Sequence, residues 1–440
     1  MSADRIPVIG FVSLGCAKNL VDTERLSSAL VAMGYQTSPD YAQCDVVIVN
    51  TCGFITPAIE ESLGAISEAL SANGKVIVTG CLGRREELIR KRCPQVFAVC
   101  GPGMRASVIR AVVKAVGRPP QSARQRLPES GILLTPPHYA YLKIAEGCRH
   151  RCSFCIIPKL RGDLRSREEG SVFAEARDLA SRGVRELLVI AEDTSDYGFD
   201  LTPKSSLSAL LKKLSSLGPW LRVHYVYPQS EADRVVELMA EDLVLPYIDV
   251  PLQHVALPVL KAMRRPGSLE KAMDTISRWR RIRPDIAIRS TFITGFPGET
   301  RSQFKELLAF LKEARLDRVG CFPYSDVEGA EANSLPGAVD PDEREARARE
   351  LMEAQAQISY EKLEERMGKE YDVIIDYVSD EGDAVGRTRY EAPDVDGTVS
   401  LPKTQGVRPG DIVRAKMVSH DEHDLGAEIV SKLDKPIKFR

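Results

Sequence analysis

Three closely spaced cysteines restrict the possible folds of this chain more than any other feature. Cys148, Cys152 and Cys155 lie in the run EGCRHRCSFCIIP. This spacing supplies three thiolates, whereas a closed structural zinc site or an electron-carrying iron–sulfur cluster normally has four ligands. Three thiolates that hold a cubane of four irons leave one iron free for a substrate or cofactor. The spacing therefore predicts an iron–sulfur centre with an open iron, and three unrelated cysteines in one loop are the alternative.

The length and composition are those of an ordinary globular protein with several domains. The 440 residues are enough for two or three cores, and 43% hydrophobic and 28% charged residues are typical values. The net charge of -2 gives no overall attraction to nucleic acid or membranes. We find no leader and no apolar run near the roughly 18–20 residues of a membrane span. Ten cysteines in a chain of this kind suit a reducing compartment, so we expect a cytoplasmic protein.

Residues 7–117 alternate short apolar runs with longer amphipathic stretches. IGFVSL, CDVVIVN and GKVIVTG are rich in Val and Ile and predict buried strands, while the stretches between them have helical spacing. Strand–helix alternation predicts a parallel sheet with helices on both faces. Residues 118–134 are rich in Pro, Arg and Ser and predict a linker.

About six strand-like runs, separated by helical ones, follow in residues 135–366. Their number and order predict an open, partial (β/α)6 barrel with its active site at the carboxyl ends of the strands. Cys148 directly follows the first run, YLKIAEG, and the charged stretch 340–368 predicts a long helix. The short strand-like runs of residues 367–433 predict a small all-β barrel. The predicted fold class is α/β, with this third domain added.

Cys16, Cys52 and Cys81 are distant in sequence but occupy equivalent places. Each directly follows a predicted strand, in FVSLGC, VIVNTC and VIVTGC. Because the carboxyl ends of parallel strands lie along one edge of a sheet, the three thiols can converge there without a fourth ligand. Buried cysteines are also common packing residues, and this is the alternative.

Both sets of cysteines lie in runs that resemble known families. EGCRHRCSFCIIP resembles the signature of radical S-adenosylmethionine (SAM) enzymes, and GFVSLGCAKNLVDTE, NTCGFI and TGC resemble the amino-terminal domain of methylthiotransferases. The resemblance implies two 4Fe-4S clusters, one held by the catalytic set Cys148, Cys152 and Cys155 and an auxiliary one held by Cys16, Cys52 and Cys81. It also implies two uses of SAM, as methyl donor to sulfur and as source of a 5′-deoxyadenosyl radical.

The resemblance also indicates residues that contact SAM. Phe154 is at the family position against the adenine, with a core aromatic as the alternative. Glu192 and Asp193, in AEDTSDYG, follow the second barrel strand, where the family binds the methionine end of the cofactor. The usual Gly-Gly-Glu form is absent, so ordinary loop carboxylates are the alternative. Gln253, after the fourth strand, either faces the same pocket or has a structural role.

Several further runs are similar to the ribosomal-protein methylthiotransferases, among them SLGCAKNLVDTE, AEDTSDYG, LPYIDVPLQH and FITGFPGET. This resemblance covers nearly the whole chain and implies methylthiolation of an aspartate β-carbon in small-subunit ribosomal protein twelve. An electron donor and a sulfur source are implied as further partners. The closest alternative is a methylthiotransferase acting on a transfer RNA adenosine. The alternative from another class is a non-catalytic iron–sulfur or RNA-binding protein.

The charge of the last domain bears on the choice of substrate. Residues 367–433 resemble a TRAM domain, which grips RNA in the tRNA-modifying relatives. Residues 367–430 contain 7 Lys or Arg and 14 Asp or Glu, a net charge of −7. Phosphate binding needs a basic face, whereas an acidic face attracts a basic protein. We therefore expect a basic ribosomal protein as substrate and no nucleic acid as direct substrate, with a merely solvated acidic surface as the alternative.

Overall fold

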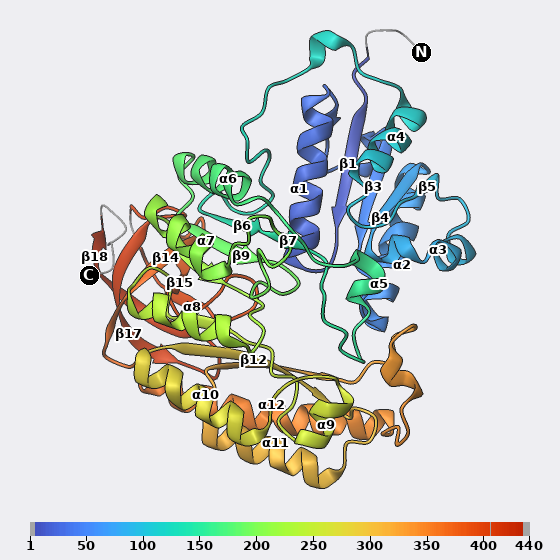
Figure 1. Cartoon of the computed structure of the whole chain (residues 1–440). Helices are drawn as coiled ribbons and strands as arrows, with labels where there is room; N and C mark the ends of the chain where they lie inside the picture. The colour runs from blue at the N-terminus through green and yellow to red at the C-terminus, as the bar shows by residue number, and fades with distance from the viewer. Residues whose placement is uncertain (1–4, 405, 434–440) are drawn as a thin grey trace.

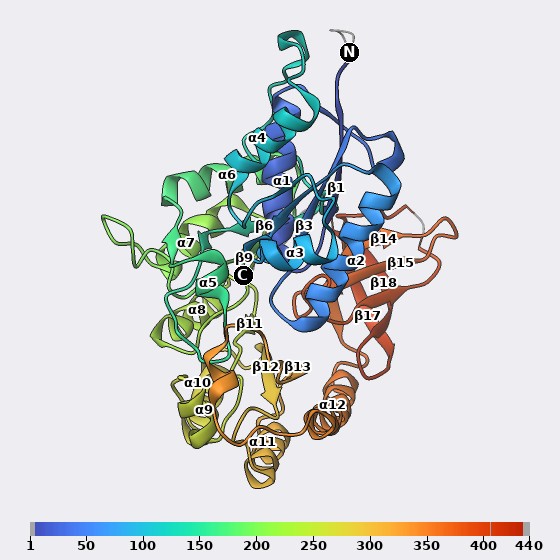
Figure 2. The ribbon, with the colours of Figure 1, turned by 90° about the vertical axis from the view of Figure 1, so that its right-hand side faces the viewer.

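The computed structural model describes residues 5–404 and 406–433, which form two parallel α/β units and a small β barrel. In Figure 1 the amino-terminal unit is blue, the larger barrel runs from green to orange, and the small barrel is red. Figure 2 shows the same three parts turned by 90°, with the small barrel beside the larger one. None of the helices in the described ranges combines the length and apolar character needed to cross a membrane.

The amino-terminal unit is a parallel sheet with helices on both faces, as predicted. The strand order is β2-β1-β3-β4-β5. Its elements are β1 (Val8–Ser13), α1 (Ala17–Ala32), β2 (Gln36–Thr37), η1 (Tyr41–Gln43), β3 (Val46–Thr51), α2 (Thr56–Asn73), β4 (Val76–Gly80), η2 (Cys81–Arg84), α3 (Glu86–Arg92), β5 (Ala98–Val99) and α4 (Arg105–Val116). Val47 and Val49 pack with α2 and α3, whereas Val46 and Ile48 pack with α1 and α4. Burial on both faces explains the continuous apolar runs of these strands.

The central unit is an open barrel of six parallel strands in which neighbours in space are neighbours in sequence, which confirms the predicted partial (β/α)6 barrel. The strand order is β6-β9-β10-β11-β12-β13. The strands are β6 (Tyr139–Lys143), β9 (Glu186–Ile190), β10 (Trp220–Val223), β11 (Tyr247–Asp249), β12 (Ala287–Thr294) and β13 (Arg318–Pro323), with the short pair β7 (Ala145–Glu146) and β8 (Arg165–Ser166). The helices are α5 (Ile157–Arg161), α6 (Glu169–Ser181), α7 (Leu207–Leu214), η4 (Ser215–Leu217), α8 (Ser230–Ala240), α9 (Leu257–Ala262), α10 (Leu269–Ile282), α11 (Arg301–Ala314), η5 (Glu331–Ser334) and α12 (Pro341–Glu364). The short η3 (Gln121–Ala123) belongs to the connecting segment, which lies against the end of α1.

The run YLKIAEG is not one continuous strand, and this part of the prediction is wrong. β6 ends at Lys143, after which the chain leaves the sheet and forms β7, which pairs antiparallel with β8. Gly147 then turns the chain with φ 72°, and a Cβ there would lie 2.3 Å from a backbone oxygen of the opposing segment. Only glycine fits this turn. Cys148 therefore begins a loop between β7 and α5 instead of directly following a barrel strand.

Side chains alternate between the two faces of the barrel sheet. Leu142, Val189 and Ile248 face outward and form the main hydrophobic core with the surrounding helices. The lumen is polar by contrast, because the intervening positions include the buried side chains of Arg222 and Asp249. Buried charges need a partner, either within the protein or in a ligand.

The last unit is a closed five-stranded barrel with the order β14-β15-β16-β18-β17, in agreement with the predicted small all-β barrel. Its strands are β14 (Glu370–Val378), β15 (Ala384–Thr388), β16 (Val399–Leu401), β17 (Ile412–His420) and β18 (Leu425–Leu433). Val373, Val399 and Val413 are among the residues that fill its interior.

The loop 389–397 between β15 and β16, which we call the floor loop, covers the amino-terminal ends of the larger barrel's strands. Glu391 pairs with Arg318 at the start of β13, at 3.4 Å. Asp396 accepts a hydrogen bond from the hydroxyl of Tyr247 at the start of β11, at 2.7 Å. In Figure 1 the small barrel accordingly lies on the opposite side of the larger barrel from α5, the helix that follows the Cys148 loop.

These contacts revise the interpretation of the acidic charge. Four of the acidic residues counted in this domain bond to the larger barrel or to the segment leading into it: Asp376, Glu391, Asp394 and Asp396. Their charge is used within the chain and is not offered to a partner. The net charge of the segment therefore overstates the acidity of its free surface.

Candidate functional site

Cys16, Cys52 and Cys81 meet at the carboxyl edge of the amino-terminal sheet. Cys16 is the N-cap of α1, Cys52 directly follows β3, and Cys81 begins η2 after β4. Burial raises the pKa of Cys81 to about 11, and the nearby thiols of Cys16 and Cys52 add to the increase. These three cysteines, which we call the auxiliary triad, are therefore close in space as well as equivalent in sequence.

Glycine backbones form the wall around the auxiliary triad. A Cβ on Gly15 would lie 2.8 Å from the Cβ of Cys52, and one on Gly53 would lie 2.8 Å from the nitrogen of Leu82. Side chains at either position would fill the space between the thiols. The charge of Lys18, backbone N–H groups in the first turn of α1 and the charge of Arg161 lower the pKa of Cys16, which is exposed at this edge of the sheet. The triad thus has room and donors for an anionic group.

Cys148, Cys152 and Cys155, which we call the radical triad, lie in the loop between β7 and α5. The backbone N–H of His150 donates to the sulfur of Cys148 at 3.4 Å. Burial raises the pKa values of Cys148 and Cys155 to about 12, and the neighbouring thiols contribute. Protonated thiols release their protons when they bind a metal, so this loop is suited to a metal centre that makes thiolates favourable.

Neither triad is arranged for a single metal ion. In the described part of the chain, the metal-ligating side chains whose donor atoms all lie within 4.8 Å of one another are His150, Asp193 and Asp196. Zinc–sulfur bonds of about 2.3 Å require sulfurs closer together than this limit. The wider spacing in both triads suits a multi-iron cluster better.

The group His150, Asp193 and Asp196 is an ion-paired network that supports the loop. The ring of His150 stacks on Tyr227 at 3.9 Å and lies 2.7 Å from Asp193 and 3.2 Å from Asp196. Although burial opposes it, hydrogen bonds to both carboxylates raise the pKa of His150 to about 9. A protonated imidazole has no lone pair for a metal. The network therefore holds the radical triad in place.

Two buried acceptors next to the radical triad have no donor. In residues 5–404 and 406–433, neither carboxylate oxygen of Glu192 nor the side-chain oxygen of Gln253 has a hydrogen-bond partner. Gln253 is also held at the unusual φ of 72°. Asp193 differs, because it accepts from the backbone and hydroxyl of Ser195 and bonds to His150. Glu192 and Gln253 are therefore available to a ligand, whereas Asp193 is occupied.

Phe154 anchors the radical triad against the barrel helices. Its ring packs beside Met263, Phe296 and Tyr324 in a small hydrophobic cluster at the end of α9. The neighbouring Ser153 donates its hydroxyl to the carbonyl of Ala262 at 2.7 Å. Phe154 is half-buried, so one part of the ring remains open to a ligand.

Six charged side chains lie between the two triads and form what we call the bridge cluster: Lys18, Asp22, Lys143, Glu146, Arg161 and Glu192. Arg161 bonds to Glu146 at 2.6 Å, and its positive charge lowers the pKa of Cys81, which packs against Ile156 and Leu160 on the same side of the barrel mouth. Its Nε lies 3.5 Å from Glu192, which in turn adds to the raised pKa of Cys155. Both triads therefore border the same buried polar group.

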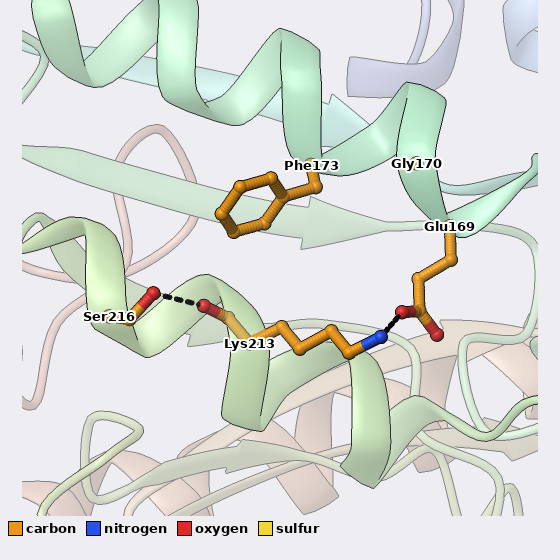
Figure 3. Close-up of a pocket in the computed structure, with 5 residues that line it drawn as sticks. All are labelled: Glu169, Gly170, Phe173, Lys213 and Ser216. Carbon is orange, nitrogen blue, oxygen red and sulfur yellow. Dashed lines mark hydrogen bonds and ion pairs between the residues drawn. The ribbon is translucent and has the colours of Figure 1, made fainter.

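A surface hollow of about 300 Å³ lies between α6 and α7. It is lined by Glu169, Gly170, Phe173, Lys213 and Ser216 (Figure 3). Lys213 is paired with Glu169, and the hydroxyl of Ser216 donates to the carbonyl of Lys213 at 2.7 Å. The hollow is on the helical, outward side of the barrel sheet, so it is separate from the lumen and from both triads.

Comparison with known proteins identifies each part of the chain. Residues 9–101 match the Uncharacterized protein family UPF0004, residues 142–311 the Radical SAM superfamily, and residues 367–430 the TRAM domain. The ribosomal protein uS12 methylthiotransferase RimO of Escherichia fergusonii is 54% identical over 430 residues, covering 95% of this chain and 97% of its own length. RimO of Proteus mirabilis is 52% identical over 440 residues, with coverage of 98% and 99%.

The chain belongs to the RimO family of ribosomal protein uS12 methylthiotransferases. This confirms the predicted enzyme class, a radical SAM methylthiotransferase, and the predicted cofactors, two 4Fe-4S clusters and SAM. Among solved structures, the radical S-adenosylmethionine methyltransferase TsrM from Kitasatospora setae has a TM-score of 0.54 at 16% identity, covering 72% of this chain and 73% of that chain. At this identity the likeness shows the shared fold alone.

Of the six bridge-cluster residues in this RimO-family site, the sequence predicted a role only for Glu192. Asp22, Lys143 and Arg161 are far apart along the chain, and each is an ordinary charged residue in its local run. Lys18 and Asp22 are four residues apart on α1 and thus share a face, but the helix predicted from the sequence began only at Thr23. Charged residues on one helical face that packs against a barrel need partners there.

Proposed function

We propose that this chain transfers a methylthio group to the β-carbon of one aspartate in ribosomal protein uS12, as the RimO family name and the sequence resemblance imply. The observation that carries the proposal is that two three-thiol sets border one buried polar group. Cys81 of the auxiliary triad packs against Ile156, the residue that follows Cys155 of the radical triad. Arg161 and Glu192, 3.5 Å apart, act electrostatically on Cys81 and Cys155 respectively. A substrate side chain in this space would reach both centres, as coupled chemistry at one carbon requires.

We assign one cluster to each triad. Cys16, Cys52 and Cys81 would hold the auxiliary 4Fe-4S cluster, and Cys148, Cys152 and Cys155 the cluster that binds SAM. The glycine wall around the first set and the backbone N–H bonds to the second support this assignment. Three thiolates in each set leave one iron open for an exogenous ligand.

The unpartnered acceptors support a SAM site beside the radical triad. Glu192 and Gln253 would accept from the ammonium and hydroxyl groups of the cofactor, and the open side of Phe154 would contact its adenine. Asp193 fits this role less well, because its oxygens already bond to Ser195 and His150. When bound, the clusters and SAM supply the methylated sulfur and the 5′-deoxyadenosyl radical.

The chain itself positions the reactants and keeps water away. Arg161 ties the amino-terminal unit to α5 and the barrel mouth through Asn19 and Glu146. At the other end of the lumen, the floor loop closes the barrel with Glu391 and Asp396. A reactive carbon radical needs such an enclosure, which limits side reactions.

Further partners follow from the balance of the reaction. Cleavage of SAM to a radical consumes an electron, and each inserted methylthio group consumes a sulfur atom, so we propose an external electron donor and a sulfur source. The exposed edge at Cys16 gives the auxiliary triad an access route for sulfur. A cytoplasmic location would provide both the reducing conditions and the ribosomal protein.

Mass spectrometry of uS12 tests the proposed function. We expect a methylthio mass gain on one aspartate in cells that contain this gene, and its loss when the gene is deleted. Expression of the wild-type chain from a plasmid should restore the modification, whereas a chain with Cys148→Ala should not. An unchanged uS12 in all strains, together with a methylthio adenosine in transfer RNA that depends on the gene, would favour the RNA-modifying alternative.

A further inference from the structure

Lys18 is a buried cation that makes no direct contact with an anion in the described part of the chain. Lys18 is 9% exposed and lies at the start of α1, two positions after Cys16. In the described ranges its ammonium has no hydrogen bond and no carboxylate oxygen within 4.0 Å. Its one close contact is the ring of Tyr225, whose centroid lies 3.6 Å away. Cation–π contact alone leaves a desolvated ammonium with unused donors.

The other cations of the bridge cluster are fully paired. Lys143 bonds to Asp22 at 2.6 Å and also to Glu146. Arg161 bonds to the same two carboxylates, at 3.1 and 2.6 Å. The cluster as a whole balances three cations against three carboxylates, the third carboxylate being Glu192, 3.5 Å from Arg161. Lys18 is nevertheless the one cation of the cluster that contacts no carboxylate directly.

Lys18 lies between the two triads. Its positive charge lowers the pKa of Cys16, and its side chain extends from the amino-terminal unit to Tyr225, which follows β10 at the mouth of the barrel. Tyr225 is held at φ 57°, an unusual conformation for an aromatic residue, by a hydrogen bond from its N–H to Asp249 at 3.1 Å. The ring is thus held in contact with the ammonium, next to the carboxyl end of β10.

We propose that Lys18 binds the side-chain carboxylate of the substrate aspartate. This inference rests on the proposed function and names the residue that selects for an acidic side chain. The β-carbon that reacts is bonded directly to the carboxylate carbon. A residue that binds the carboxylate therefore also positions the C–H bond that reacts. An ammonium with three donors, aimed into a water-poor space, discriminates strongly against a neutral amide.

Equilibrium binding of two synthetic peptides tests the proposal. Both span the modified aspartate of uS12, one with Asp and one with Asn at that position, and both are titrated into the anaerobically reconstituted full chain without reductant. We expect the wild-type protein to bind the Asp peptide about 10- to 100-fold more tightly, the range for one charge-assisted hydrogen bond. In Lys18→Met, which keeps the length but not the charge, the ratio should fall to about one.

Three matched variants separate this role from others. Lys18→Arg should keep most of the preference for the Asp peptide, and Lys91→Met, at an exposed position of α3, should keep all of it. Iron content and SAM cleavage without peptide are measured in Lys18→Met as well, because Lys18 also lowers the pKa of Cys16. Loss of iron or of SAM cleavage would assign Lys18 to a cofactor and overturn the proposal.

The remaining outcomes are also decisive. A Lys18→Met protein that keeps the wild-type ratio, or weakens both peptides equally, overturns the inference. If that variant does not fold, the wild-type ratio decides alone, and a ratio near one overturns it. Failure of the wild-type protein to bind or modify either peptide would defeat the proposed function, whereas normal modification with an unaltered ratio in Lys18→Met would defeat this inference only.

Discussion

The two ends of the larger barrel contain the same kinds of buried charged residues but use them in opposite ways. At the amino end, Glu186 bonds to Arg222 at 2.7 Å and to Arg387 at 2.8 Å, so its charge is compensated within the chain. At the carboxyl end, Glu192 lies 3.5 Å from the Nε of Arg161 but accepts no hydrogen bond, and Lys18 contacts no carboxylate among the described residues. Buried charge by itself therefore does not indicate function. Buried charged groups with few close partners of opposite charge do.

The largest effect is expected at the radical triad. Replacing Cys148, Cys152 and Cys155 by alanine should abolish formation of 5′-deoxyadenosine and reduce the iron from about eight to about four per chain, the content of one cubane. Iron analysis and chromatography of the reaction products measure both. Cys93→Ala, a buried cysteine outside both triads, is the control and should keep all the iron.

Substitution of the auxiliary triad should stop sulfur transfer and leave radical formation intact. Alanine at Cys16, Cys52 and Cys81 should again leave about four irons. SAM cleavage should persist because the radical triad is intact, while methylthio-aspartate should disappear. Full iron content in either triple variant would contradict the assignment of ligands, and loss of SAM cleavage in this one would contradict the division of roles.

Glu192 and Asp193 offer a matched test of the unpartnered-acceptor criterion. Glu192→Gln should raise the KM for SAM about tenfold or more, since one charged hydrogen bond to the ligand is lost, with little effect on unfolding. Asp193→Asn should instead weaken the support from His150 and lower the stability of the loop, with a smaller effect on KM. Initial rates and thermal unfolding distinguish the two. The reverse pattern would show that Asp193 is the ligand.

Substitutions at the amino end of the larger barrel should lower the stability of the protein without affecting the catalysed reaction directly. Although burial opposes it, Arg366 and Arg318 hold the pKa of Glu391 at about 2, below the value of about 4.3 in an unfolded chain. The folded state therefore favours the ionised form, so its contribution is complete above about pH 4.3 and is lost as the pH falls toward 2. Glu391→Gln should cost about 3 kcal/mol at neutral pH, because it leaves two arginines uncompensated.

Denaturant unfolding at neutral and acidic pH measures this effect. The stability difference between wild type and Glu391→Gln should shrink below about pH 4. Lys213→Met, in the surface hollow of Figure 3, is the control, because exposed ion pairs contribute about 0–1 kcal/mol. An equal loss in both variants, or a difference that does not depend on pH, would remove the distinction between the two ends of the barrel.

The sequence predicted those parts of the molecule that depend on local pattern. Cys52 and Cys81 could be placed at one edge because each follows a run of β-branched residues whose direction in a parallel sheet is fixed. The barrel followed from six such runs. The break after Lys143 was not predictable, because it depends on pairing with β8, some twenty residues later and outside the sheet.

The contacts between distant segments could not be predicted. Arg161 was an ordinary basic residue in sequence, and its role depends on a helix from another unit that brings Asp22 to it. The net charge of residues 367–430 overstated the acidity of the free surface for the same reason. A charge count does not show where each side chain points, and Glu391 points toward Arg318 of the larger barrel. Such properties arise from tertiary packing, which periodicity does not encode.

The floor loop makes the larger barrel depend on a segment that is synthesised after all six of its strands. Residues 389–397 leave the ribosome later than β13, so Arg318 and Tyr247 have no partners from this loop until it has been made. A nascent polypeptide that ends before residue 389 would contain every cysteine of both triads, and the amino end of its barrel would lack Glu391 and Asp396. The contacts of this loop therefore form only after both sets of cysteines have been synthesised.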